Sequence, residues 1–196
     1  MRKFAIAGAA AALFAIPAAA NAQAFVQAEV GIDSVSAYGE SDEGVAYGVT
    51  AGYDMPLSGG MFVGIQGTVA DSTTKECITF EGGGEATFAA SAVSVVGKEC
   101  VKTGRDLAAL ARLGTSVGDK SKLYLLAGYT NARFRATYND GEFSASESAN
   151  ADGVRVGAGY QYDISDSLFV KAEYHYSNYE ADISRHNGII AVGAKF

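Results

Sequence analysis

Apolar and polar side chains alternate one for one along most of the chain after residue 23. In residues 154–162 the even positions are Val, Val, Ala, Tyr and Tyr, whereas the odd positions are Arg, Gly, Gly and Gln. Residues 168–176 repeat the pattern, with Leu, Val, Ala, Tyr and Tyr alternating with Phe, Lys, Glu and His. Strict alternation is typical of a β-strand whose two faces meet different surroundings.

Eight segments share this alternation and predict eight strands, at residues 25–33, 44–54, 60–71, 105–117, 122–138, 153–163, 168–180 and 187–196. Short turns are expected after the second, fourth and sixth strands. Longer loops rich in Gly, Ser, Asp and Glu are expected elsewhere, around residues 40–43, 72–104 and 139–152. This organisation predicts an all-β fold, an eight-stranded antiparallel up-and-down barrel.

The two faces of the predicted strands differ in a way that indicates which one is inside. One face is apolar with almost no charge, and the other carries charged side chains among many glycines. Glycines on a water-exposed face would only weaken the strands, whereas inside a narrow barrel they leave room for charged side chains to pair. We therefore expect a transmembrane β-barrel with a polar lumen network of Glu29, Asp106, Arg112, Arg155, Lys171, Glu173, His175 and Lys195.

Aromatic residues fall near the two ends of the outward face, as in the girdles at membrane interfaces. Those expected near the short turns are Tyr53, Tyr160, Tyr162 and Phe196, and those near the long loops are Tyr47, Tyr174 and Tyr176. The alternative is a soluble lipocalin-like carrier with these side chains in its core. That alternative predicts extraction without detergent.

The first twenty-two residues have the features of a signal peptide. Arg2 and Lys3 precede an apolar segment at residues 4–16, and Ala20 and Ala22 stand at positions −3 and −1 of a cleavage site. The apolar segment is too short for a membrane-spanning helix. We expect a signal peptide at residues 1–22, a barrel domain at residues 23–196, and export to the cell outer membrane.

Composition narrows the function classes further. The chain is 48% hydrophobic, which excludes a disordered protein, and its net charge of −7 argues against nucleic-acid binding. Two His and two Cys are too few for most metal sites, and no cofactor is expected. Cys77 and Cys100 flank a glycine-rich stretch of the longest loop, and an oxidising compartment favours a disulfide between them.

With these features the chain resembles the small outer-membrane β-barrels of Gram-negative bacteria, of the opacity-protein and OmpA-like porin-family type. The resemblance rests on the leader, the eight alternating segments, the Gly157-Ala158-Gly159-Tyr160 strand and the terminal Phe196. The terminal aromatic strand resembles the family's signal for the barrel-insertion machinery. The resemblance implies a monomer in contact with outer-membrane lipid and lipopolysaccharide, with loops available to a host or surface ligand.

The favoured function is structural, with loops displayed for adhesion or envelope integrity and no enzymatic activity. His175, Glu173 and Ser177 have the residue types of a hydrolase, but they share the lumen face, away from membrane lipid. A narrow low-conductance pore and a lipid-modifying enzyme remain alternatives. Arg133 and Arg135 fall on the lipid-facing parity, so they lie beyond the hydrocarbon near lipopolysaccharide phosphates, or a bulge reverses the register.

Overall fold

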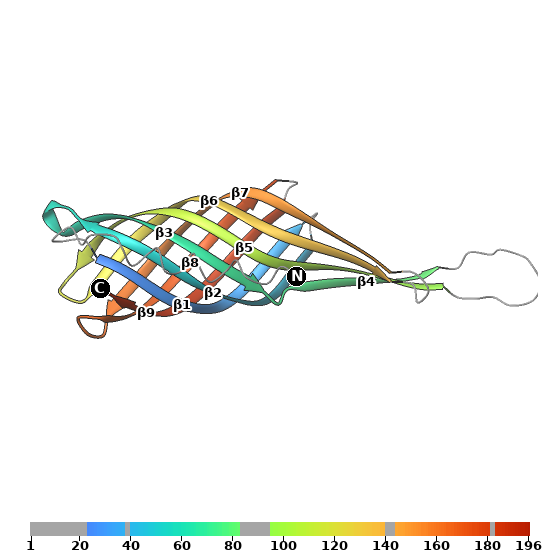
Figure 1. Ribbon diagram of the computed structural model, residues 1–196, viewed down its shortest axis with the longest axis horizontal. Helices are drawn as coiled ribbons and strands as arrows, with labels where there is room; N and C mark the ends of the chain where they lie inside the picture. The colour runs from blue at the N-terminus through green and yellow to red at the C-terminus, as the bar shows by residue number, and fades with distance from the viewer. Residues whose placement is uncertain (1–22, 38–39, 83–94, 140–143, 181–182) are drawn as a thin grey trace, which may run out of the picture.

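The fold is a closed antiparallel barrel with a sheet that projects from one end (Figure 1). The computed structural model describes residues 23–37, 40–82, 95–139, 144–180 and 183–196, so the predicted signal peptide with Ala20 and Ala22 lies outside the described residues. The strands are β1 (Gln23–Ala37), β2 (Glu40–Pro56), β3 (Met61–Ser72), β4 (Lys75–Gly82), β5 (Val95–Val117), β6 (Ser121–Asn139), β7 (Ser144–Asp163), β8 (Leu168–Tyr179) and β9 (Ile183–Lys195). A 3-10 turn, η2 (Ser58–Gly60), joins β2 to β3. The described residues contain no helix of sufficient length and apolarity to span a membrane.

Eight of these strands close the barrel, which confirms the predicted fold class. Each pairs with its neighbours in the order β3-β2-β1-β9-β8-β7-β6-β5, and β3 pairs with β5 to complete the circle. All of these ladders are antiparallel. Closure matters because every strand then has a partner on both sides, as backbone groups in a membrane require.

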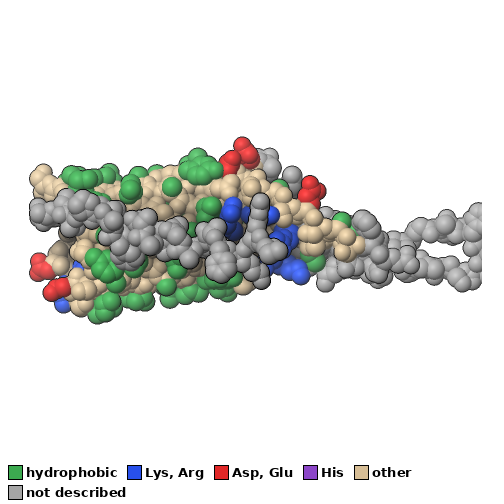
Figure 2. Space-filling model, viewed as in Figure 1, with side chains coloured by type: hydrophobic (Ala, Val, Ile, Leu, Met, Phe, Trp, Pro, Cys, Tyr) green, Lys and Arg blue, Asp and Glu red, His purple; other side chains and the backbone are tan. Residues whose placement is uncertain are grey.

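Burial alternates along the strands with the predicted parity. Strand β3 reads exposed, buried, exposed, buried over most of its length, and β8 does the same. Apolar side chains cover the outside, where Ile32, Ile65 and Leu125 are 75%, 66% and 65% exposed. Figure 2 shows this apolar cover along the barrel wall. The apolar face is therefore the outer face, and the charged face lines the lumen.

The prediction of a long loop over residues 72–104 is wrong, because part of this segment forms paired strands. Residues 72–104 were expected as an irregular loop, but β4 pairs with the first part of β5 to form a hairpin, and β7 begins at Ser144 inside the other long loop. Both faces of this sheet meet water, so its strands lack the alternation of apolar and polar side chains although their backbone pairing continues. The polar sequence therefore indicated loops. The barrel thus has a turn end, with η2 and two tight turns, and a hairpin end from which β4–β7 project (Figure 1).

Candidate functional site

Four charged side chains close the lumen near the hairpin end. They come from four strands, are 1–3% exposed, and are here called the charged plug: Asp33, Asp106, Arg155 and Arg185. Arg185 donates from Nε and Nη2 to the two Asp33 oxygens at 2.7 and 2.9 Å, and from Nη1 to Asp106 Oδ2 at 2.6 Å. Arg155 Nη2 donates to the same Asp106 oxygen. Two acids and two bases therefore balance across the lumen.

Neutral side chains complete the hydrogen bonding of the charged plug. Asp33 accepts from Ser72 at 2.5 Å, Thr74 at 3.1 Å and Asn187 at 2.8 Å. Asp106 also accepts from the Thr130 hydroxyl at 2.9 Å. Buried ion pairs are tolerated when their remaining donors and acceptors are satisfied in this way.

Two plug residues, Asp33 and Arg185, were missed by the sequence reasoning. The first predicted strand ended at Asp33 and the last began at Asn187, so Asp33 stood at a strand end and Arg185 lay in the loop before the last strand. Strand β9 in fact begins at Ile183, and Arg185 has the same inward parity as Asn187. Asp33 already had the inward parity of Glu29 within its predicted strand, and starting the last strand two residues earlier would have added Arg185 to the predicted lumen network.

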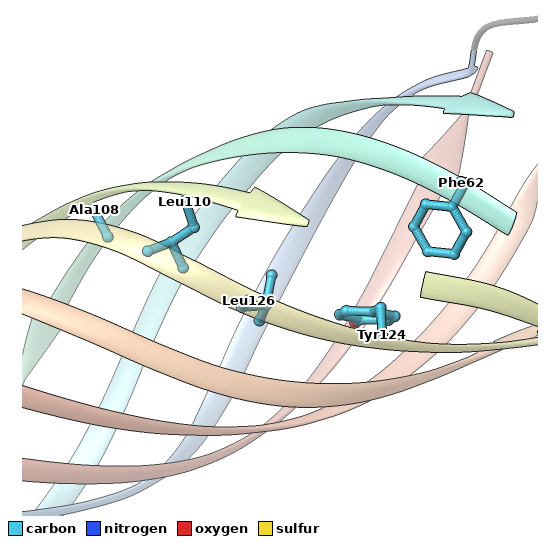
Figure 3. Close-up of a cluster of buried hydrophobic side chains, with 5 residues drawn as sticks. All are labelled: Phe62, Ala108, Leu110, Tyr124 and Leu126. Atoms are coloured by element: carbon cyan, nitrogen blue, oxygen red, sulfur yellow. The ribbon is translucent and has the colours of Figure 1, made fainter. Parts of the chain in front are cut away.

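A second cluster fills the lumen toward the turn end. Its four rings are here called the aromatic collar: Phe25, Phe62, Tyr124 and Phe169, all at most 4% exposed. Figure 3 shows Phe62 of β3 and Tyr124 of β6 close together on the two strands that flank β5, with Leu126 and Leu110 farther along the lumen. The Arg112 guanidinium carbon lies 4.2 Å from the centre of the Tyr124 ring and 4.7 Å from that of Phe25. These distances are typical of cation–π contacts.

Each ring of the collar lies over a glycine on a neighbouring strand. A Cβ atom placed on the glycine would overlap the ring in all four pairs, which are Phe25 with Gly52, Phe62 with Gly114, Tyr124 with Gly159 and Phe169 with Gly193. The lumen glycines therefore make room for aromatic rings as well as for charged side chains.

The residues with hydrolase-like side chains are held by other partners. Glu173 accepts hydrogen bonds from the Tyr124 hydroxyl and contacts His175 Nε2 at 3.0 Å. The Ser177 hydroxyl instead accepts from Arg155 Nε at 2.7 Å. Glu173, His175 and Ser177 are all buried in the lumen, and among the contacts of the described residues Ser177 is not joined to His175.

The remaining predicted lumen residues lie closer to the turn end or are less buried. Lys195 pairs with Asp163, a partner that the sequence reasoning did not name. Glu29 is only partly buried and accepts from Gln27 at 3.0 Å and Thr50 at 2.9 Å. All eight predicted residues have inward parity, but they belong to separate groups along the lumen and not to one network.

The predicted girdle residues lie on the outer wall. Near the turn end, Tyr160, Tyr162 and Phe196 are 43%, 41% and 68% exposed, and Tyr53 is half-buried. Toward the hairpin end, Tyr47 and Tyr174 are 49% and 52% exposed, and Tyr176 is half-buried. The Tyr174 hydroxyl lies 2.6 Å from His186 Nδ1. This placement is consistent with contact at two membrane interfaces.

Five exposed cations gather on the outward face where the projecting sheet leaves the barrel. This outer basic cluster consists of Lys75, Lys102, Arg105, Arg133 and Arg135. Lys75 lies directly opposite Lys102, and Lys102 directly opposite Arg135, so three like charges share one row. Within the described parts of the chain none of the five has a salt bridge. Figure 2 shows blue side chains gathered at this level.

A β-bulge places Lys102 and Arg105 on the same face. The β5–β6 register shifts between Thr103 and Asp106, where two residues of β5 stand opposite Arg133 alone. The β6–β7 register is unbroken from Ser121 to Asn139, so no bulge turns Arg133 or Arg135 inward. Both arginines keep their outward parity, above the apolar wall.

The two cysteines occupy neighbouring positions in the hairpin. Cys77 of β4 stands directly opposite Cys100 of β5, two residues beyond the Lys75–Lys102 pair. Cys100 is buried, at 8% exposure, and the side chain of Cys77 lies outside the described residues. Directly opposite residues of antiparallel strands have Cα atoms roughly 4.5–5.5 Å apart, which is within the range that a disulfide spans.

Comparison with protein families gives a match to a model described as an outer membrane protein beta-barrel domain, over residues 6–196. Comparison with curated proteins gives no match.

Solved structures with the same fold include bacterial outer-membrane proteins. One is Ail, the attachment invasion locus protein of Yersinia pestis, crystallised with the heparin analogue sucrose octasulfate. It is 19% identical, with a TM-score of 0.60 over 90% of this chain and 99% of Ail. Neisserial surface protein A is 18% identical, with a TM-score of 0.55 over 88% of this chain and 97% of that protein. A major outer membrane protein of Thermus thermophilus is 13% identical, with a TM-score of 0.50 over 89% and 99%.

Proposed function

This chain belongs to the outer membrane protein β-barrel family, and from that premise we propose that it displays an anion-binding surface at the outer leaflet. In barrels of this kind the short turns are periplasmic and the long connections extracellular. The turn end then faces the periplasm, and the projecting sheet faces the medium. Its role is structural and interactive: the barrel is a rigid anchor, and the sheet carries the contact surface.

The outer basic cluster is the observation that carries this proposal. Like charges directly opposite each other destabilise a sheet, yet Lys75, Lys102 and Arg135 form such a row. An anionic partner offsets that cost. Because the cluster continues the outer wall, the partner it meets first in the membrane is lipopolysaccharide, whose phosphates lie at this level. The same proposal includes a signal peptide at residues 1–22 that directs export, and a C-terminal strand with Phe196 that the barrel-insertion machinery recognises.

Removing two cations of the row should weaken binding to purified lipopolysaccharide. Each cation near an anionic surface contributes about 1 kcal/mol, so Lys102→Ala with Arg135→Ala should lower affinity by more than about tenfold. Affinity is measured for the folded protein in detergent, with whole and dephosphorylated lipopolysaccharide at two salt concentrations. Loss of the preference for the phosphorylated form in the double variant supports the proposal.

Lys120→Ala is the matched control, since Lys120 is an exposed cation in the turn between β5 and β6 at the opposite end. It should bind as the unmodified protein does. Equal affinity of the double variant and the control would contradict the proposed site. Because Ail was crystallised with sucrose octasulfate, that compound is a second probe here. Binding of the soluble sulfated sugar without lipopolysaccharide would assign the cluster to an external polyanion.

We further propose that Cys77 and Cys100 form a disulfide that fastens β4 to β5. Their opposite positions in the ladder support this pairing, and the closed loop of 22 intervening residues corresponds to about 3 kcal/mol in the chain-entropy model. A non-reducing digest of protein from the envelope should give one linked pair of peptides. Two free thiols after alkylation of the folded protein would refute the pairing.

A further inference from the structure

A polar site lies on the outer wall next to the outer basic cluster, where strands β6 and β7 pair. Tyr129 and Asn131 of β6 share the outward face with Asp152 of β7, which stands directly opposite Asn131. The Tyr129 hydroxyl and the Asn131 amide both donate to Asp152 Oδ1, at 2.5 and 2.6 Å. Tyr129 is 51% exposed, so its ring remains open to the surroundings. The Asp152 carboxylate is thus held in a fixed position on an open surface.

One oxygen of this carboxylate is left open. Both donors use Oδ1, and in the part of the chain that the structure describes Oδ2 accepts no hydrogen bond. Arg133 is the next outward residue of β6 after Asn131, but it forms no salt bridge with Asp152. Tyr129 and Asn131 therefore hold the carboxylate away from the cations. An ionised carboxylate can only accept hydrogen bonds, so the site presents an acceptor to a donor from outside.

Polarity increases in steps along the outward face of β6. In order toward the hairpin end, the outward residues are Leu125, Ala127, Tyr129, Asn131, Arg133 and Arg135. Two apolar residues of the wall are thus followed by an aromatic residue with a hydroxyl, an amide and two cations. Successive outward positions of a strand are roughly 6.5–7 Å apart. A sugar ring with an attached phosphate can bridge such a spacing between the polar site and Arg133.

We infer that this site binds the sugar of a phosphorylated sugar headgroup, with the ring against Tyr129 and Asp152 and the phosphate against Arg133. The inference rests on the proposed function, because it names the part of lipopolysaccharide that lies beside the cations. A carboxylate repels phosphate, so Asp152 within an anion-binding surface needs a partner group that donates hydrogen bonds. Sugar hydroxyl and amide groups are such donors, and the Tyr129 ring offers an apolar face to the C–H groups of the sugar.

The test compares lipopolysaccharide with phosphatidic acid, which carries a phosphate but no sugar, as ligands of the folded protein in detergent. Asp152→Ala removes a negative charge, so electrostatics alone predicts tighter binding of both ligands. Loss of the sugar contact predicts the opposite for lipopolysaccharide. Its affinity should fall about tenfold, as expected for a lost hydrogen bond to a charged group, while the affinity for phosphatidic acid should not fall.

Glu43→Ala is the matched control, since Glu43 is an exposed carboxylate at the hairpin end of β2 and lies outside the site. It should lower neither affinity. Tyr129→Phe keeps the ring but removes the hydroxyl that holds Asp152, so it should lower the affinity for lipopolysaccharide by a smaller factor and spare phosphatidic acid.

An affinity of Asp152→Ala for lipopolysaccharide that equals or exceeds that of the unmodified protein would overturn the inference, as would an equal loss for both ligands. The double variant Lys102→Ala with Arg135→Ala separates the two proposals, because it should weaken binding of both ligands. If the double variant binds normally, the proposed function fails. If it binds weakly but Asp152→Ala does not, only the sugar contact fails. Glucosamine 1-phosphate that competes as well as lipopolysaccharide itself would assign the site to a free sugar phosphate and overturn the lipid source.

Discussion

Replacing Asp106 with alanine is expected to lower the free energy of unfolding by about 3–5 kcal/mol, because it leaves buried cations without their partner. Arg155 and Arg185 both donate to the same Asp106 oxygen. Arg185 would keep Asp33, but Arg155 would keep only the hydroxyls of Ser177 and Tyr179. Neither arginine can reach bulk water from its position in the lumen, at 1% and 3% exposure.

Urea-induced unfolding of the barrel in lipid vesicles, followed by tyrosine fluorescence, measures this loss. The control is Asp166→Ala, which removes an exposed carboxylate from the turn between β7 and β8. A surface change of that kind is expected to stay within about 0.5 kcal/mol. If both variants unfold at the same urea concentration, the charged plug does not contribute to the free energy of unfolding as the structure implies.

Gly159→Val should destabilise the barrel about as strongly as Asp106→Ala does, but through a steric effect and not an electrostatic one. The new side chain would occupy the position of the Tyr124 ring. Overpacking of this kind costs about 1–3 kcal/mol. Displacing Tyr124 would also remove its hydrogen bond to Glu173, for about 1.5–3 kcal/mol more, and its contact with Arg112.

The neighbouring substitution Ala158→Val is the matched control, because Ala158 faces outward and the added methyl groups would meet lipid. Folded membrane barrels resist SDS at room temperature and change their apparent mass on boiling, so one gel of boiled and unboiled samples gives the folded fraction. Gly159→Val should lower that fraction sharply, and Ala158→Val should leave it unchanged. A normal folded fraction for Gly159→Val would mean that the ring is not confined by the glycine.

The barrel itself could be predicted because the two sides of its wall meet opposite surroundings. Alternation in β7 and β8 is nearly perfect within the membrane, and it identified both the strands and the inward face. Candidate lumen residues such as Asp106 and Arg155 followed from parity alone. Parity assigns a face but not a height along the barrel, so it could not divide the lumen into the charged plug and the aromatic collar.

Other features depend on pairings that one strand does not reveal. The ring of Tyr124 and its glycine are 35 positions apart in sequence, and Asp33 and Arg185 come from β1 and β9. The projecting sheet was missed because water on both of its faces removes the hydrophobic pattern that marks a strand. The row of Lys75, Lys102 and Arg135 became visible only with the register of three strands.

The bulge at Gly104 and Arg105 has a consequence for how this protein can change. Deleting one of these residues would reverse the phase of β5 above the barrel, so that Lys102 and Cys100 would exchange faces with their neighbours while Asp106 stayed in the lumen. In β5, the barrel wall and the projecting sheet are thus specified by separate stretches of sequence that meet at the bulge. Substitutions in the projecting sheet can therefore accumulate without changing which residues of the barrel wall face the lumen. Such independence suits a surface exposed to changing surroundings.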